Sequence, residues 1–303
     1  MARQNVFPLE RLEDIRRRPR DFRLLERIPF EYARLDGHLP IVLNEPEPGE
    51  RIHTLVILDT ETTGLKHSED VIIELGLIKV TFAYDRRLVL SIDRMYDGFE
   101  DPGRPLSREI TDLTGISDAM VSGQRLDEDR VGQLMATDPL VVAHNAAFDR
   151  PFFEKRFPSL GNLAWADSYS GVDWRRMGYR RANLEDLAFS DGWFYDAHRA
   201  NDDCLALLWM LYTHPGAFGQ LINSAVGESY LVRALRTPFS AKDELKSRGY
   251  FFESRYKAWS RNCRTEEEVR SEEAFLNGLR EDAFSPMEIV KLSFNARNRF
   301  KSA

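Results

Sequence analysis

Four stretches in the first half of the chain show the apolar patterns of β-strands. Residues 55–58 and 140–143 are uninterrupted apolar runs, which are typical of strands buried on both faces of a sheet. Residues 71–82 are rich in β-branched side chains, and residues 88–96 alternate apolar with polar positions. This order predicts three consecutive strands in an antiparallel meander, followed later by a fourth strand.

Helical spacing dominates the segments around and after the fourth strand. A meander followed by strand and helix units predicts a mixed α/β sandwich. The predicted helices cover residues 107–113, 126–135, 147–157, 184–188 and 201–212.

The first fifty residues differ from this core. Residues 9–27 place isolated apolar residues among many charges, which predicts an amphipathic helix or helical pair that acts as a packing arm. Four prolines between residues 28 and 50 interrupt any long periodicity and predict an extended connector. We therefore expect an N-terminal helical arm and connector over residues 1–50 and a central domain over residues 51–215.

The chain changes character after Pro215. Residues 229–264 contain nine Lys or Arg against three Asp or Glu, interleaved with seven aromatic residues. We expect a small basic and aromatic α+β module over residues 225–303, with an acidic helix at 265–282 and a weakly structured basic tail at 284–303. Single-strand nucleic-acid binding and a basic surface around a small aromatic core both fit this composition.

Composition limits the class of protein. The chain has 303 residues, 43% of them apolar, and a net charge of −7, which mildly disfavours a protein that coats nucleic acid. No stretch approaches the roughly 20 apolar residues that cross a bilayer. The N-terminus also lacks the apolar centre of a secretory signal, so we expect a cytoplasmic protein without membrane partners. The two cysteines, Cys204 and Cys263, lie in no Cys/His cluster that would indicate zinc.

An acidic pair follows the first apolar run. Asp59 and Glu61 are two positions apart in an extended chain, so their side chains point to the same face and can share a cation. Carboxylate oxygens suit Mg²⁺ or Mn²⁺. Acids that merely end a strand at the solvent edge have the same spacing, so the pair alone does not identify a site.

Two further polar clusters occupy comparable places. Residues 144–149, with the sequence HNAAFD, put Asp149 in the first turn of a helix, where the helix dipole also favours an acid. Residues 198–203, with the sequence HRANDD, lead into another helix, which would hold Asp203 rigidly and leave His198 in a looser segment. A surface turn explains such a cluster equally well, so only the joint occurrence of all three clusters is informative.

Together the clusters resemble the three motifs of the DEDDh exonuclease family, which has the ribonuclease H-like superfold. The resemblance covers residues 52–214 and is strongest to the epsilon proofreading subunit of bacterial DNA polymerase III and to stand-alone epsilon-like exonucleases. It implies a mixed five-stranded sheet flanked by helices. The matching residues are the pair Asp59 and Glu61, Asp149 after a His-Asn stretch, and the His-x-Ala-x-x-Asp motif at His198, Ala200 and Asp203.

The resemblance also implies the chemistry. The expected reaction is hydrolysis of phosphodiester bonds at the 3′ ends of DNA or RNA, with release of nucleoside 5′-monophosphates. His198 would take a proton from the attacking water. Two Mg²⁺ or Mn²⁺ ions would be held by Asp59, Glu61, Asp149 and Asp203.

Single-stranded 3′ ends are the expected partner of this site. Core packing is an alternative explanation for Leu65 and Phe148, and bracing of the helix that carries Asp149 is one for His144 and Asn145. An exposed loop with Arg175, Arg176, Arg180 and Arg181 either follows the substrate phosphates or is simply solvated. The residues expected to contact the terminal nucleotide are Thr62, Thr63, Leu65, His144, Asn145 and Phe148.

Several roles remain open at this level. DNA and RNA are not distinguished, because the metal core acts on both. A polymerase-bound proofreader, an RNA-maturing nuclease and a defence nuclease all fit the motifs, with a polymerase as one candidate protein partner. A catalytically silent scaffold of the same fold is the alternative from another class, and it is disfavoured because no metal ligand is missing.

Overall fold

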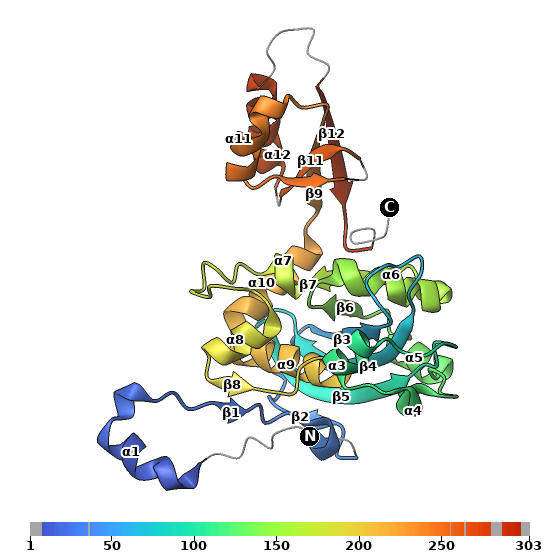
Figure 1. Cartoon of the computed structure of the whole chain (residues 1–303), viewed down its shortest axis with the longest axis vertical. Coiled ribbons are helices and arrows are strands. Elements are labelled where there is room, and N and C mark those ends of the chain that lie inside the picture. Colours follow the sequence, from blue (N-terminus) through green and yellow to red (C-terminus); the bar gives the residue numbers. More distant parts are fainter. Residues whose placement is uncertain (1–7, 36, 255, 264, 280–286, 298–303) are drawn as a thin grey trace.

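The computed structural model describes residues 8–35, 37–254, 256–263, 265–279 and 287–297. Its centre is a six-stranded sheet in the order β2-β5-β4-β3-β6-β7, with helices on both faces (Figure 1). The antiparallel meander consists of β3, β4 and β5, while β6 and β7 run parallel to β3. The strands are β2 (Ile41–Val42), β3 (Ile52–Thr62), β4 (Ile72–Ala83), β5 (Leu88–Phe99), β6 (Leu140–Ala143) and β7 (Ala164–Asp167).

The predicted mixed α/β class and the meander are confirmed. The sheet has one strand more than the five expected, because part of the proline-rich connector joins it. Ile41 and Val42 pair with Ile92 and Ser91 of β5. An edge strand carries unpaired amide and carbonyl groups, and a short extended segment beside it satisfies some of them.

Alternation along β3 decides which helices each residue contacts. Leu55 and Ile57 share a core with α8, α9 and α10, whereas Val56 and Leu58 share one with α5 and α6. Because successive side chains of a strand point to opposite faces, Asp59 continues the first face. These helices are α5 (Glu128–Met135), α6 (Ala146–Arg156), α8 (Leu184–Ser190), α9 (Ala200–Thr213) and α10 (Pro215–Val226).

Two elements of this domain were not predicted. β7 is only four residues long, and α10 begins at the proline where the chain changes composition. The apolar face of α10, which includes Phe218 and Leu221, is buried in the core that it shares with α9. Among the described residues, no helix has both the length and the apolar character needed to cross a membrane. The shorter helices are α3 (Arg108–Thr114), α4 (Asp118–Val121) and α7 (Ser168–Gly171).

The N-terminal arm is more broken than predicted. Pro19 ends the first helical stretch, because proline does not continue a helix whose amide is needed. Leu12 and Leu24 are exposed, and the arm contacts the domain mainly through Ile28 and through parallel pairing of β1 with β8. Its elements, with β8, are η1 (Leu9–Arg11), α1 (Leu12–Arg17), η2 (Pro19–Asp21), β1 (Glu26–Arg27), α2 (Tyr32–Leu35) and β8 (Trp193–Phe194).

The C-terminal region forms a second, four-stranded antiparallel sheet in the order β10-β11-β9-β12, with its own apolar core under α11 and α12 (Figure 1). The prediction of a weakly structured tail was wrong for residues 288–294, which form β12 and pair with β9 over seven positions. Residues 280–286 and 298–303 lie outside the described ranges. The elements are β9 (Ser229–Leu235), η4 (Phe239–Ala241), α11 (Lys242–Ser247), β10 (Phe251–Glu253), β11 (Ala258–Cys263), α12 (Glu266–Gly278) and β12 (Glu288–Phe294).

Candidate active site

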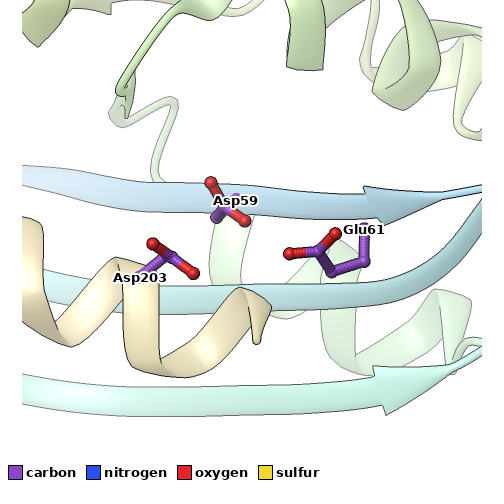
Figure 2. A group of neighbouring side chains, drawn as sticks. All are labelled: Asp59, Glu61 and Asp203. Carbon is purple, nitrogen blue, oxygen red and sulfur yellow. The ribbon is translucent and has the colours of Figure 1, made fainter. Parts of the chain in front are cut away.

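Three carboxylates meet at the carboxyl end of β3. Asp59 and Glu61 project from this strand, and Asp203 projects toward them from the first turn of α9 (Figure 2). One oxygen of each lies within 4.8 Å of the others. Hard divalent cations such as Mg²⁺ and Mn²⁺ take oxygen ligands of this kind. The cluster is therefore suited to hold such a cation.

Asp149 approaches the same strand end from the opposite face of the sheet. It lies in the first turn of α6 and is 3% exposed. Its Oδ1 accepts hydrogen bonds from the amide of Thr60 at 3.1 Å and from the hydroxyl of Thr60 at 2.8 Å. Thr60 faces α6 because it alternates with Asp59 and Glu61 along β3. Helices on both faces thus bring acids to one strand end.

Burial and mutual repulsion disfavour the charged forms of these acids. Burial, followed by the charge of Asp149, raises the pKa of Asp59 well above its usual value. Burial likewise raises the pKa of Glu61 to about 8, that of Asp149 to about 7 and that of Asp203 to about 6. Positive charge from bound cations would compensate for ionising all four. The donor set therefore fits the divalent metal ions that the motifs imply.

The segment before α9 orients Asp203. Its Oδ2 accepts hydrogen bonds from the amides of His198 at 2.8 Å and Arg199 at 3.2 Å. Its Oδ1 accepts one from the hydroxyl of Tyr195 at 2.9 Å. Sequence reasoning missed Tyr195, which precedes the motif and carries no spacing pattern of its own.

His198 lies at the rim of the acidic cluster. Its side chain is exposed, and its φ of +65° is a left-handed conformation that residues other than glycine seldom adopt. The charge of its imidazole lowers the pKa of Asp203, which places the ring near that carboxylate. The structure therefore brings the histidine and all four predicted acids into one region.

The loop after β3 is braced and carries one exposed apolar side chain. Thr62 is 5% exposed, and its hydroxyl donates a hydrogen bond to Gly64 O at 2.6 Å. The hydroxyl of Thr63 donates to Asp70 Oδ1 at 3.0 Å. Leu65 is 80% exposed, so core packing does not explain it. The two threonine hydroxyls hold the loop that presents Leu65.

His144 braces the segment around the second motif. Its Nδ1 lies 2.8 Å from Ser168 Oγ and its Nε2 lies 2.6 Å from Ala182 O, and burial lowers the pKa of the ring. The bond to Ala182 also anchors one end of the arginine-rich loop beside this motif. The four arginines of that loop are exposed at positions 175, 176, 180 and 181.

Asn145 and Phe148 differ in how far they are committed to the protein. The side chain of Asn145 is exposed, with a φ of +91°. Phe148 is half-buried, with its ring 5.1 Å from that of Phe152 and 6.2 Å from that of His67. Part of the Phe148 ring therefore packs in the protein and part faces outward.

Glu74 and Arg199 are further members of the site that sequence reasoning missed. Glu74 is fully buried in β4 and accepts hydrogen bonds from Arg199. One pattern might have drawn attention to it, since Glu74 is the single charged residue between positions 71 and 78. A lone acid within an apolar strand needs a partner, because burial of an unpaired charge is costly.

Comparisons with known proteins agree with this geometry. The family model described as an exonuclease, RNase_T, matches residues 56–211, slightly more than half of the chain. The PolC-type DNA polymerase III of Halalkalibacterium halodurans is 37% identical over 129 residues, which is 42% of this chain and 8% of that protein. The same polymerase of Streptococcus mutans is 36% identical over 128 residues, or 41% of this chain and 8% of that protein. The chain thus spans less than a tenth of the length of these relatives.

Two solved structures are similar at a coarser level. Exonuclease X in complex with 5′-overhanging duplex DNA has a TM-score of 0.40 at 24% identity, and the match covers 55% of this chain and 98% of that one. Exonuclease I in its apo form has a TM-score of 0.45 at 15% identity, covering 59% and 49%. The assignment rests on the family match, the three motifs and the central sheet. The chain belongs to the exonuclease family, as a DEDDh-type, epsilon-like member with a ribonuclease H-like fold.

Proposed function

We propose that this protein is a divalent-metal-dependent exonuclease that removes nucleotides from the 3′ ends of nucleic acid. The observation that carries the proposal is the convergence of Asp59, Glu61 and Asp203 within 4.8 Å, with Asp149 beside them and His198 at the rim. The product is a nucleoside 5′-monophosphate. Single-stranded ends are the preferred substrate.

The four acids divide the work of holding two cations. When bound, two divalent ions stabilise both the attacking and the leaving oxygen at phosphorus. Asp59 interacts electrostatically with each of the other three acids, so it is the residue best placed to serve both ions. Glu61 and Asp203 complete one set of ligands. Asp149, on the other face of β3, serves the second ion.

His198 is the proposed general base. An imidazole can take a proton at neutral pH, and an exposed one beside the acids can reach a water molecule at the terminal phosphate. The water oxygen bonds to phosphorus as its proton passes to the imidazole. The bond from phosphorus to the 3′ oxygen of the neighbouring nucleotide then breaks, and that oxygen leaves with a proton.

Residues around the acids would select the 3′ terminus. Leu65 is apolar, exposed and held on a braced loop, which suits it to wedge beside the terminal base. Phe148 offers a partly exposed ring on which a base of any sequence can stack. The backbone around Thr62 and Thr63 and the exposed amide of Asn145 would contact the sugar and the phosphate.

Phosphate contacts further along the strand fall to the arginine-rich loop. Its four exposed guanidinium groups lie on a loop that is anchored to the second motif through His144 and Ala182. Arginine binds phosphate oxygens without reading sequence, as an end-trimming enzyme requires. Because the curated relatives are DNA polymerases, DNA is the proposed substrate and a polymerase is a candidate partner.

Digestion of end-labelled oligonucleotides tests the proposal. Single- and double-stranded DNA and RNA, labelled at the 3′ or the 5′ end, are incubated with Mg²⁺, Mn²⁺ or EDTA. We expect mononucleotides to be released from the 3′ end only, with no release in EDTA and near-complete loss in Asp59→Ala and His198→Ala. Asp202→Asn, next to the motif but outside its spacing, should stay within about threefold of wild type. Endonucleolytic products or full activity in chelator would refute the proposal.

A further inference from the structure

A buried ion pair holds the segment that carries His198. Glu74 lies opposite Glu61 in the register of β3 and β4 and is 0% exposed. Arg199 follows His198, and its Nε and Nη2 donate hydrogen bonds to Glu74 Oε1 at 3.0 and 2.7 Å. The pair thus joins the centre of the sheet to the residue next to the proposed general base.

Further backbone bonds extend this grip to the start of α9. Ala200 N donates to Glu74 Oε2 at 3.0 Å, while the amides of His198 and Arg199 donate to Asp203. Three consecutive amides are therefore held by two carboxylates, one from the sheet and one from the helix. A left-handed φ at a residue with a side chain persists only where the surroundings enforce it, and these bonds do so at His198.

The close seat of this segment also depends on Gly76. A Cβ placed there would lie 2.6 Å from the carbonyl carbon of Ala200 and 2.8 Å from Asn201 N. Any side chain at this position would push the start of α9 away from β4. Glu74 and Gly76 lie on the same face of β4, two positions apart, so one holds the segment by charge and the other by close contact.

Stability alone does not account for a buried pair of this kind. Taking a carboxylate out of water costs free energy that an ion pair often fails to return, and apolar residues of similar shape commonly serve as well. The Arg199 side chain is 33% exposed, and its guanidinium also lies 5.6 Å from the centre of the Phe99 ring. What the pair adds is a defined position for the backbone at residues 198–200.

We propose that Glu74 and Arg199 are positioning residues for His198, holding its imidazole where it can take the proton of the attacking water. This inference rests on the proposed function of His198 as the general base. Neither Glu74 nor Arg199 has to touch the substrate. Their effect on the reaction passes through the backbone of residues 198–200.

A double-mutant cycle on the full-length protein tests the inference. Arg199→Ala and Glu74→Gln are each made alone and with His198→Ala, and kcat and KM are measured on a 3′-labelled single-stranded oligodeoxynucleotide with Mg²⁺. Each single variant should lower kcat about ten- to a hundredfold with little change in KM, because a misplaced base loses most of its contribution. In the His198→Ala background each should lower kcat by less than about twofold more.

Conservative and matched variants separate positioning from general damage. Arg199→Lys keeps the charge but loses the two-point geometry, so its kcat should lie between wild type and Arg199→Ala. Arg86→Ala removes a similar two-point pair with Glu50, whose side chain is 5% exposed, and should leave kcat within about twofold of wild type. Mn²⁺ affinity measured by calorimetry should stay within about threefold in every variant. If Arg199→Ala does not fold, the Lys and Gln variants carry the test.

Two results would overturn the inference. An equal loss of kcat with and without His198 would show that Arg199 and Glu74 act independently of the imidazole. A raised KM with unchanged kcat in Arg199→Ala would show that Arg199 instead binds the substrate. Full activity of His198→Ala would refute the proposed function of the histidine itself, so the two failures are distinguishable.

Discussion

The carboxylate of Asp149 is tied to Thr60 by two hydrogen bonds, from the amide at 3.1 Å and from the hydroxyl at 2.8 Å. Both bonds favour the charged carboxylate and oppose the burial that raises the pKa of Asp149 to about 7. Thr60→Val keeps the shape of the side chain but removes the hydroxyl donor. We expect the pKa of Asp149 to rise further and the apparent Mg²⁺ affinity at neutral pH to fall about tenfold.

Activity measured against Mg²⁺ concentration checks this expectation. In mildly alkaline buffer the deficit of Thr60→Val should shrink, because Asp149 ionises there even without the hydroxyl donor. Thr114→Val is the matched control, since Thr114 is buried and its hydroxyl donates to Ile110 O outside the site. An unchanged Mg²⁺ requirement in Thr60→Val would separate Asp149 from the metal ions.

The metal-free protein should become less stable as pH rises. Burial raises the pKa of Glu61 to about 8, of Asp149 to about 7 and of Asp203 to about 6, from ordinary values of 4.5 and 3.8. The folded state therefore binds more protons than the unfolded state, and that stability is present below about pH 4 and lost on rising through about pH 8. The loss in the free energy of unfolding should be on the order of 1–3 kcal/mol.

Urea unfolding across this pH range, with EDTA or with Mg²⁺, measures the effect. Mg²⁺ should restore stability most in the alkaline half, where the acids are charged and repel one another in its absence. The metal-free protein would have to gain stability between pH 5 and pH 8 to contradict the electrostatic description of the site.

Leu65→Ala should reduce activity without reducing stability. Because the Leu65 side chain is 80% exposed, its removal leaves the core intact. We expect kcat/KM to fall about tenfold, which corresponds to losing one stacking-sized contact with the terminal base. Leu113→Ala, which truncates another exposed leucine (52%) on α3, should leave kcat/KM unchanged. Equal activity of the two variants would exclude Leu65 from substrate contact.

Truncation can separate the C-terminal module from the catalytic centre. The cut belongs after Gly227 rather than after Pro215, because α10 buries Phe218 and Leu221 in the core shared with α9. We expect residues 1–227 to keep Mn²⁺ binding and to bind single-stranded DNA about tenfold more weakly than the full chain. Fluorescence anisotropy and calorimetry provide the two measurements. Equal DNA affinity in both proteins would remove the module from the substrate path.

Local patterns predicted some parts of this protein better than others. The meander and the strand at residues 140–143 followed from apolar patterning, because burial on one or both faces of a sheet sets that pattern. The short strand β7 and the tail strand β12 did not follow from it. Each is stabilised by pairing with a neighbouring strand, and β12 acquires its place only where β9 offers a free edge.

By itself the sequence determined which acids share a face. The period of two along a strand puts Asp59 and Glu61 together, and helical spacing puts Asp203 in the first turn of α9. Only the tertiary structure decided which side chains hold them, as with Thr60 on Asp149, 89 positions away, and Glu74 on Arg199, 125 positions away. Periodicity and capping act over a few residues. Contacts between distant segments arise from packing of the whole sheet, so local patterns carry no record of them.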